Sequence, residues 1–246
     1  MWFDIRVIMR REIHGFFTTP LMALLLWAYL VLAMALPLYF GGFFDRDQAD
    51  MQSFFNFMPW ILLVLCPAIG MRAWADDYKT GMIEIIHTMP ISLPRWMIGK
   101  FFGAWAILTI IILATWPMAA MVGYLGNPDF GPICAGYLAV ILLAGLFLAS
   151  SQFASSIASN HVIAFVIGVL LCFVLLMAGS PLLAGILGGI GGWHFISDFL
   201  LRLSVQNYYD LMVAGDIGIV GVMTLMALII LFQFCTVLQL RRRQGA

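Results

Sequence analysis

The residues best suited to chemistry gather in one polar segment, residues 72–100, of a chain that is otherwise mostly apolar. This segment holds seven of the 24 charged residues, which comprise 12 Lys and Arg and 12 Asp and Glu. The seven are Arg72, Asp76, Asp77, Lys79, Glu84, Arg95 and Lys100. Acid–base chemistry requires groups such as Glu84 and His87, but no nucleophile or second base accompanies them. The pattern therefore does not favour a catalytic site.

The remaining histidines and the cysteines give no stronger sign of catalysis. Cys66, Cys134, Cys172 and Cys235 are far apart, form no CxxC pair and lie in or beside apolar runs. We expect buried, inert thiols rather than a metal or redox site. An enzyme within a membrane would need paired ionisable groups inside its spans, and these spans contain almost none. The sequence predicts a protein that is not itself an enzyme, with no bound cofactor or metal.

Composition identifies the class of protein. Hydrophobic residues make up 63% of the chain and charged residues 10%, and the mean hydropathy is +1.03. Soluble domains are about half apolar and a quarter charged, so these values indicate an integral membrane protein. No cluster of Lys and Arg with interleaved aromatic residues suggests a nucleic-acid partner.

Six segments are long and apolar enough to cross a bilayer, which requires about 20 residues. They are residues 20–40, 54–72, 101–123, 132–157, 162–183 and 217–240. The first run lacks a small-residue cleavage site, so we expect it to be retained. Ser159, Asn160 and His161 separate the fourth and fifth spans and predict a tight turn. Four prolines within spans predict kinks. They are Pro37, Pro59, Pro67 and Pro117.

Positive charge predicts the orientation. If both ends lie on one side, that side receives ten basic residues. These are Arg6, Arg10, Arg11, Arg72, Lys79, Arg95, Lys100, Arg241, Arg242 and Arg243. The other side receives only Arg46 and Arg202. The positive-inside rule then places both ends and the polar segment in the cytoplasm.

The expected architecture is a single transmembrane domain, residues 1–246, in an all-α integral membrane fold. An interfacial helix precedes the first of the six spans. A short re-entrant or interfacial helical segment lies on the outer side before span six, within residues 184–216. It includes the aromatic stretch from Trp193 to Met212.

Residues 80–89 predict a short amphipathic helix between spans two and three. Its apolar face would carry Met82, Ile85, Ile86 and Met89, and its polar face Thr80, Glu84, His87 and Thr88. Asp76 and Asp77 precede it, where acidic side chains suit the positive end of a helix dipole. Pro90 and Pro94 prevent simple continuation. The residues alone leave two alternatives open: a helix resting on lipid, or a docking element for a cytoplasmic partner.

The segment resembles the inter-span loop of ABC-2-type transporter permeases, in the branch that includes gliding-motility and copper-centre-maturation permeases. The pattern is R-x-x-x-[acid]-[acid]-x-x-x-G-x-x-E-x-x-x-x-x-P, closing with G-K. It is formed by Arg72, Asp76, Asp77, Gly81, Glu84, Pro90, Gly99 and Lys100. RREIHGFFTTP, ending at Pro20, and LFLASSQFASSIASNHVIAF, residues 146–165, are also similar to that family. LSVQNYYDLMVAGDI, residues 203–217, resembles its outer segment, so the resemblance covers almost the whole chain.

The resemblance implies a permease subunit of the bacterial inner membrane, whose coupling helix is moved by a cytoplasmic ATPase subunit. The implied contacts with that subunit are Asp76, Asp77, Gly81, Met82, Glu84, His87 and Pro90. The chain has no G-x-x-x-x-G-K-[ST] loop, so ATP and Mg²⁺ would be bound by the partner. A second permease copy or a sister permease would complete a dimer. The alternative is a mechanical transmitter that passes ATP-driven motion to a periplasmic partner.

Polar residues within the spans bear on the cargo. Ser150, Ser151, Gln152, Gln233 and Thr236 either line a cargo path or join neighbouring helices, and we favour the second interpretation. With ionisable groups kept out of the membrane core, we expect any cargo to be amphipathic or lipid-linked.

Overall fold

The computed structural model describes residues 2–41, 51–79, 93–126, 128–158, 160–178 and 204–244. In these ranges the regular structure is entirely helical, so the all-α prediction is confirmed there. The helices are α1 (Trp2–Thr18), α2 (Pro20–Tyr39), α3 (Gln52–Gly70), α4 (Arg72–Lys79), α6 (Leu93–Leu113), α7 (Trp116–Leu125), α8 (Phe130–Ile157), α9 (His161–Met177), α12 (Val205–Val213) and α13 (Ile219–Gln244).

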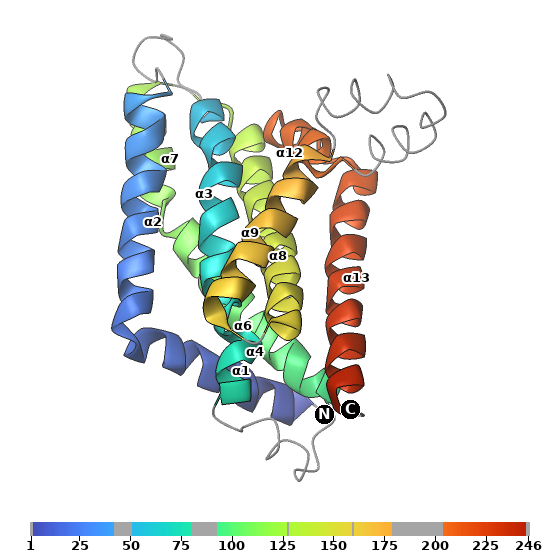
Figure 1. Ribbon diagram of the computed structural model, residues 1–246. Helices are drawn as coiled ribbons and strands as arrows, with labels where there is room; N and C mark the ends of the chain where they lie inside the picture. The colour runs from blue at the N-terminus through green and yellow to red at the C-terminus, as the bar shows by residue number, and fades with distance from the viewer. Residues whose placement is uncertain are drawn as a thin grey trace.

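The long helices stand side by side as a bundle, and α1 lies across one end of it (Figure 1). Both chain termini lie at this end, which we call the foot. The short helix α12 lies at the opposite end. The foot also carries α4, the start of α6 and the end of α13, which bear most of the basic residues of the described chain. The charge asymmetry seen in the sequence therefore runs along the bundle axis.

Five helical stretches are long and apolar enough to cross a membrane. They are Met22–Tyr39, Gln52–Ala75, Leu93–Leu125, Phe130–Ile157 and Ile219–Arg243. The chain thus has the helices of a multi-pass membrane protein. The predicted fifth span corresponds to α9, an apolar helix of 17 residues, and residues 179–183 of that prediction lie outside the described ranges.

Span three differs from its predicted bounds in two respects. The helix begins at Leu93 rather than near residue 101, because Pro94 lies in its first turn, where a backbone N–H is not needed. It is then interrupted before Trp116, at Thr115, whose Oγ1 donates to the Ile112 carbonyl at 2.6 Å. Pro117 therefore lies in the first turn of α7 instead of kinking a continuous helix.

Helix α8 is the centre of the bundle. In the most apolar 18 residues of its span 83% are buried inside the protein, against 22% in the corresponding part of Met22–Tyr39 and 28% in that of Ile219–Arg243. It packs against α3, α6, α9, α12 and α13. Gly70 allows α3 to approach closely, because a Cβ there would lie 2.5 Å from the Ser151 Cβ. Any movement of α8 must therefore displace most of the helices of the bundle.

Polar side chains within the spans join helices, as predicted. Gln233 of α13 donates through Nε2 to the Gln152 Oε1 of α8 at 3.0 Å. Ser150 and Ser151 bond the Phe147 carbonyl, at 2.9 and 2.5 Å, and lie within 3.8 Å of the Cys172 sulfur of α9. The interpretation as helix-joining groups is confirmed for these residues, whereas the Thr236 hydroxyl donates to the Phe232 carbonyl of its own helix. The expectation of buried thiols is correct for Cys66 and Cys172, but Cys235 is only half-buried and Cys134 is exposed near the start of α8.

Candidate functional site

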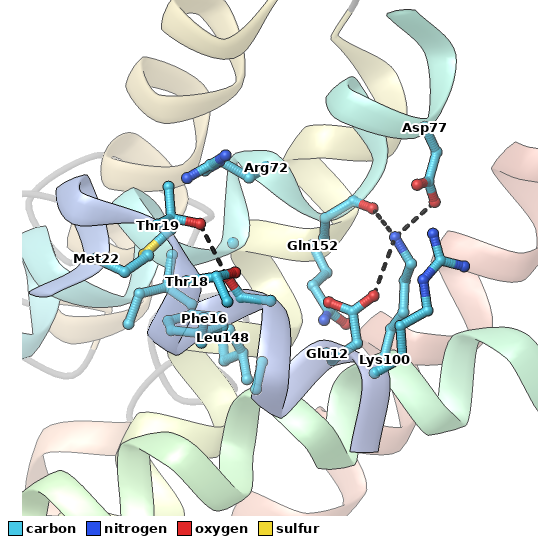
Figure 2. Close-up of a pocket in the computed structure, with 16 residues that line it drawn as sticks. Glu12, Phe16, Thr18, Thr19, Met22, Arg72, Asp77, Lys100, Leu148 and Gln152 are labelled. Carbon is cyan, nitrogen blue, oxygen red and sulfur yellow. Dashed lines mark hydrogen bonds and ion pairs between the residues drawn. The ribbon is translucent and has the colours of Figure 1, made fainter. Parts of the chain in front are cut away.

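Two acidic residues of the foot converge on one buried lysine. Lys100 of α6 is only 5% exposed. Its Nζ donates to Asp77 Oδ2 at 2.5 Å and to the Ala73 carbonyl at 2.6 Å, both in α4. Glu12 of α1 lies on the other side, with its Oε1 at 3.7 Å (Figure 2). We call Glu12, Asp77 and Lys100 the foot junction, because they tie together three helices.

The groups packed around Lys100 explain why an ammonium group is tolerated there. A buried charge is stable only when it is paired and its hydrogen-bonding capacity is met. Two carboxylates and one carbonyl surround Nζ, which also lies 5.3 Å from the centre of the Trp74 ring. The Lys100 stem is apolar and belongs to a helix that continues directly into the membrane span.

An apolar cluster lies beside the foot junction and connects its three helices to α13. Its buried members are Ile8, Trp74, Trp96, Met97, Val237 and Leu240. They come from α1, α4, α6 and α13. The Arg11 guanidinium of α1 lies 5.6 Å from the centre of the Trp96 ring, a cation–π contact. The foot is therefore one packed unit in which charge and apolar contacts act together.

Helix α4 is also fixed to the central helix. The Ser155 hydroxyl of α8 donates to the Met71 carbonyl at 2.8 Å. The same oxygen accepts from the Trp74 and Ala75 backbone N–H groups at 3.2 and 3.3 Å. These N–H groups lie in the first turn of α4, where no intrahelical acceptor is available. Helix α4 is thus held by α8 at its start and by α6 through Asp77.

Beside the foot junction lies a pocket of about 370 Å³, which we call the foot pocket (Figure 2). Helices α1, α2, α3, α4, α6 and α8 bound it. Its polar lining includes Arg11, Glu12, Arg72, Asp77, Lys100 and Gln152. The pocket thus combines three cationic groups, two carboxylates and an amide at the edge of an apolar bundle.

The structure places two of the seven residues predicted to contact an ATPase subunit. Asp76 and Asp77 belong to α4, so they lie within a helix that already begins at Arg72. Asp77 is 8% exposed and is bound to Lys100, so its carboxylate faces the bundle. Gly81, Met82, Glu84, His87 and Pro90 lie outside the described residues, as does the predicted helix 80–89.

The predicted outer helical segment is described only at its end, where α12 is helical as expected. Tyr209 of this helix is buried, and its hydroxyl donates to the Phe55 carbonyl of α3 at 2.6 Å. Burial raises the pKa of the Tyr209 phenol well above its usual value, and the nearby Asp210 adds to this effect. The hydroxyl therefore remains a neutral donor.

Sequence reasoning grouped Asp77 and Lys100 in one polar segment but did not pair them. The signal was the position of Lys100 directly before an apolar run, where a buried charge needs a partner. Among the described residues no group of three or more His, Cys, Asp and Glu side chains is arranged to hold a metal ion.

Comparison with models of known protein families gave no match for this chain, and comparison with curated proteins gave no significant match.

Proposed function

We propose that the chain is the membrane-spanning permease subunit of an ATP-driven ABC-2-type transporter. The observation that carries the proposal is the attachment of the two helices that flank residues 80–92. Asp77 of α4 and Lys100 of α6 are joined by a buried ion pair, and α4 is joined to α8 through Ser155. A force applied between these helices would therefore act on the bundle rather than on a loose loop.

In this proposal residues 80–92 contain the coupling helix. A cytoplasmic ATPase subunit, which binds ATP and Mg²⁺, contacts Gly81, Met82, Glu84, His87 and Pro90. Asp76 stands next to this segment, and Asp77 acts as an anchor through Lys100. Motion passes through α4 to the buried helix α8 and through α6 to α1. The foot faces the cytoplasm of a bacterial cell, and α9 serves as the fifth of six spans.

The cargo we propose is amphipathic or lipid-linked. The described spans place amides, hydroxyls and thiols in helix-joining hydrogen bonds, as for Gln152 and Gln233. Groups occupied in this way are poor replacements for the water of a hydrophilic solute. A cargo whose tail stays in the bilayer needs fewer polar contacts along its route.

A mechanical transmitter is the second candidate, and α12 is the observation that favours it. This helix lies at the end opposite the foot and is fixed to α3 through Tyr209 and to α8 by packing. It would carry motion of the bundle to a periplasmic partner. In that case ATP-driven movement would act on the partner, and no cargo would be transported.

The test is the ATPase activity of the complex purified through a tag on this chain. We expect the wild-type preparation to hydrolyse ATP through its associated subunit. Glu84→Lys should insert normally but lose most of this activity, since a reversed charge opposes the contact. Asp216→Lys is the matched control, because it makes the same charge change at the exposed opposite end. Equal ATPase activity in the two variants would contradict the proposed contact.

The same preparation separates cargo from transmission. Stimulation of ATP hydrolysis by lipids or lipid-linked compounds supports export of an amphipathic cargo. Stimulation by hydrophilic solutes alone contradicts that cargo class. A response only to an added periplasmic protein favours the transmitter.

A further inference from the structure

The foot junction contains two carboxylates, and Lys100 uses them unequally. Its Nζ lies 2.5 Å from Asp77 Oδ2 but 3.7 Å from Glu12 Oε1, which is too long for a hydrogen bond (Figure 2). Among the described residues the Glu12 carboxylate has no other ion pair and no hydrogen bond. The lysine therefore has a second partner of the same chemical class on another helix, at slightly longer range.

A buried donor in α4 lacks an acceptor. Trp74 is 1% exposed, and in the part of the chain that the structure describes no group accepts from its indole Nε1. Such a group loses its hydrogen bonds to water on burial and gains nothing in return. Trp96 of α6 has an unmatched indole N–H in the same way. The observed arrangement of the foot thus leaves donors unused in both helices that flank residues 80–92.

Asp77 is placed to accept from the Trp74 indole. The two residues are three apart on α4, so they lie on one side of the helix. Helical side chains lean toward the preceding turn, which directs the Asp77 carboxylate toward Trp74. Both side chains already meet at Lys100, whose Nζ lies 5.3 Å from the centre of the Trp74 ring. Rotation of the Asp77 side chain would therefore exchange the ammonium for the indole N–H.

Glu12 stays beside Lys100 whatever α4 does. It belongs to α1, which packs along α6. Gly103, one turn after Lys100, allows this approach, because a Cβ there would lie 3.0 Å from the Glu12 Cβ. If Asp77 withdraws, the ammonium can close onto Glu12 and keep a counter-charge. The exchange therefore leaves no buried charge without a partner.

Helix α4 is attached differently in its two halves. At its start, the Ser155 hydroxyl of α8 bonds three backbone groups. The Ala73 carbonyl lies in this part and accepts from Lys100. The second half, which leads into residues 80–92, is joined to α6 by the Asp77 carboxylate. Loss of this ion pair would loosen the second half while the start of the helix remains on α8.

We propose that the foot junction is a latch with two positions. In the observed position Lys100 pairs with Asp77. In the other, Lys100 pairs with Glu12 and Asp77 accepts from the Trp74 indole, so that the second half of α4 separates from α6 while α1 and α6 stay joined. The exchange is a property of this chain and does not require the ATPase subunit proposed above, so its test needs no partner.

The experiment records the indole N–H signals of the nitrogen-15 tryptophan-labelled chain by NMR in lipid nanodiscs. The chain has eight tryptophans, and the signals of Trp74 and Trp105 are assigned from their absence in Trp74→Phe and Trp105→Phe. A hydrogen-bonded indole proton resonates downfield of an unbonded one. Trp105 is the internal reference, because its N–H donates to the Ile141 carbonyl at 2.9 Å. The Trp74 signal therefore measures which position of the latch is occupied.

Two variants should move the Trp74 signal in opposite directions. Glu12→Gln removes the second counter-charge for Lys100 and should shift the signal upfield, toward the unbonded position. Asp77→Asn weakens the observed ion pair but keeps an acceptor oxygen, so it should shift the signal downfield. Each should change the ratio of the two positions roughly tenfold. Asp216→Asn, a loss of one carboxylate at the exposed opposite end, is the control and should leave the signal in place.

Two results would overturn the proposal. The first is a Trp74 signal that neither Glu12→Gln nor Asp77→Asn moves. The second is a shift in the same direction in both variants, which would indicate general loosening of the foot rather than an exchange of partners. An unchanged Trp105 signal, together with thermal denaturation, verifies that each variant remains folded.

Discussion

The two ends of the bundle are held together by different kinds of interaction. At the foot, a lysine between two carboxylates joins α1, α4 and α6. At the opposite end, a neutral phenol joins α12 to α3, and α8 adds Tyr137 to an aromatic group with Phe54 and Phe55. The Phe55 and Tyr137 rings are edge to face with centroids 5.6 Å apart.

The difference indicates which end is suited to change. A neutral hydrogen bond and edge-to-face rings lose stability gradually when displaced. A buried ion pair depends steeply on its partner, because separation exposes an uncompensated charge. Any partner that moves α4 relative to α6 must therefore alter the foot junction, whereas α12 is held to α3 by a contact that involves no charge.

The largest effect is expected from breaking the foot junction. Lys100→Met keeps the apolar stem but leaves Asp77 buried without its counter-charge, so we expect destabilisation by about 3–5 kcal/mol. Asp77→Asn introduced into Lys100→Met should recover part of this loss, because it removes the unpaired carboxylate. The measurement is thermal or SDS-induced unfolding of the purified protein. Arg241→Met, an exposed change at the same end, should shift stability by no more than about 0.5 kcal/mol.

The comparison would fail if Lys100→Met and Arg241→Met unfolded alike. It would also fail if the double variant lost as much stability as the two single variants together. Effects of independent sites add in this way, whereas those of coupled sites do not.

A smaller effect is expected at the opposite end. Tyr209→Phe removes the hydrogen bond to the Phe55 carbonyl but keeps the ring, so we expect a loss of about 1–2 kcal/mol. Tyr124→Phe serves as the control, because Tyr124 is 93% exposed. The same unfolding measurement applies. A loss as large as that of Lys100→Met would show that the two ends do not differ in the proposed way.

Helix positions were largely predictable, because apolar length and local breaks determine them. The predicted span 132–157 matches the end of α8 at Ile157, where Asn160 then caps α9 by accepting from the Val162 N–H. The early start of α6 was not predicted, because a helix-initiating Pro94 was interpreted only as a break.

The foot junction could not be predicted from local sequence patterns. Lys100 and Asp77 are 23 residues apart, and Gln152 and Gln233 are 81 apart. Which of many polar residues meet depends on how the helices pack, and neither spacing nor composition contains that information. The polar segment was nevertheless correctly identified as the place where the charges gather.

The smallest predicted effect concerns pH at the end opposite the foot, where the described residues form no buried ion pair. Partial burial raises the pKa of Asp210 above its ordinary value of 3.8, while the hydrogen bond from Gln206 Nε2 at 3.0 Å opposes the increase. A raised pKa means that the folded state binds the proton more tightly than the unfolded state. The contribution of Asp210 to stability is therefore fully present below pH 3.8 and is lost as the pH rises through the raised pKa.

Two variants should move this dependence in opposite directions. Asp210→Asn removes it and should make the protein more stable near neutral pH, by less than about 0.5 kcal/mol because solvent screens the exposed carboxylate. Gln206→Ala removes the opposing hydrogen bond and should enlarge the loss of stability on raising the pH. The measurement is the difference in unfolding temperature from wild type between pH 4 and pH 7, with Asp216→Asn as the control. A pH dependence of the same size in Asp210→Asn and wild type would assign that dependence to groups other than Asp210.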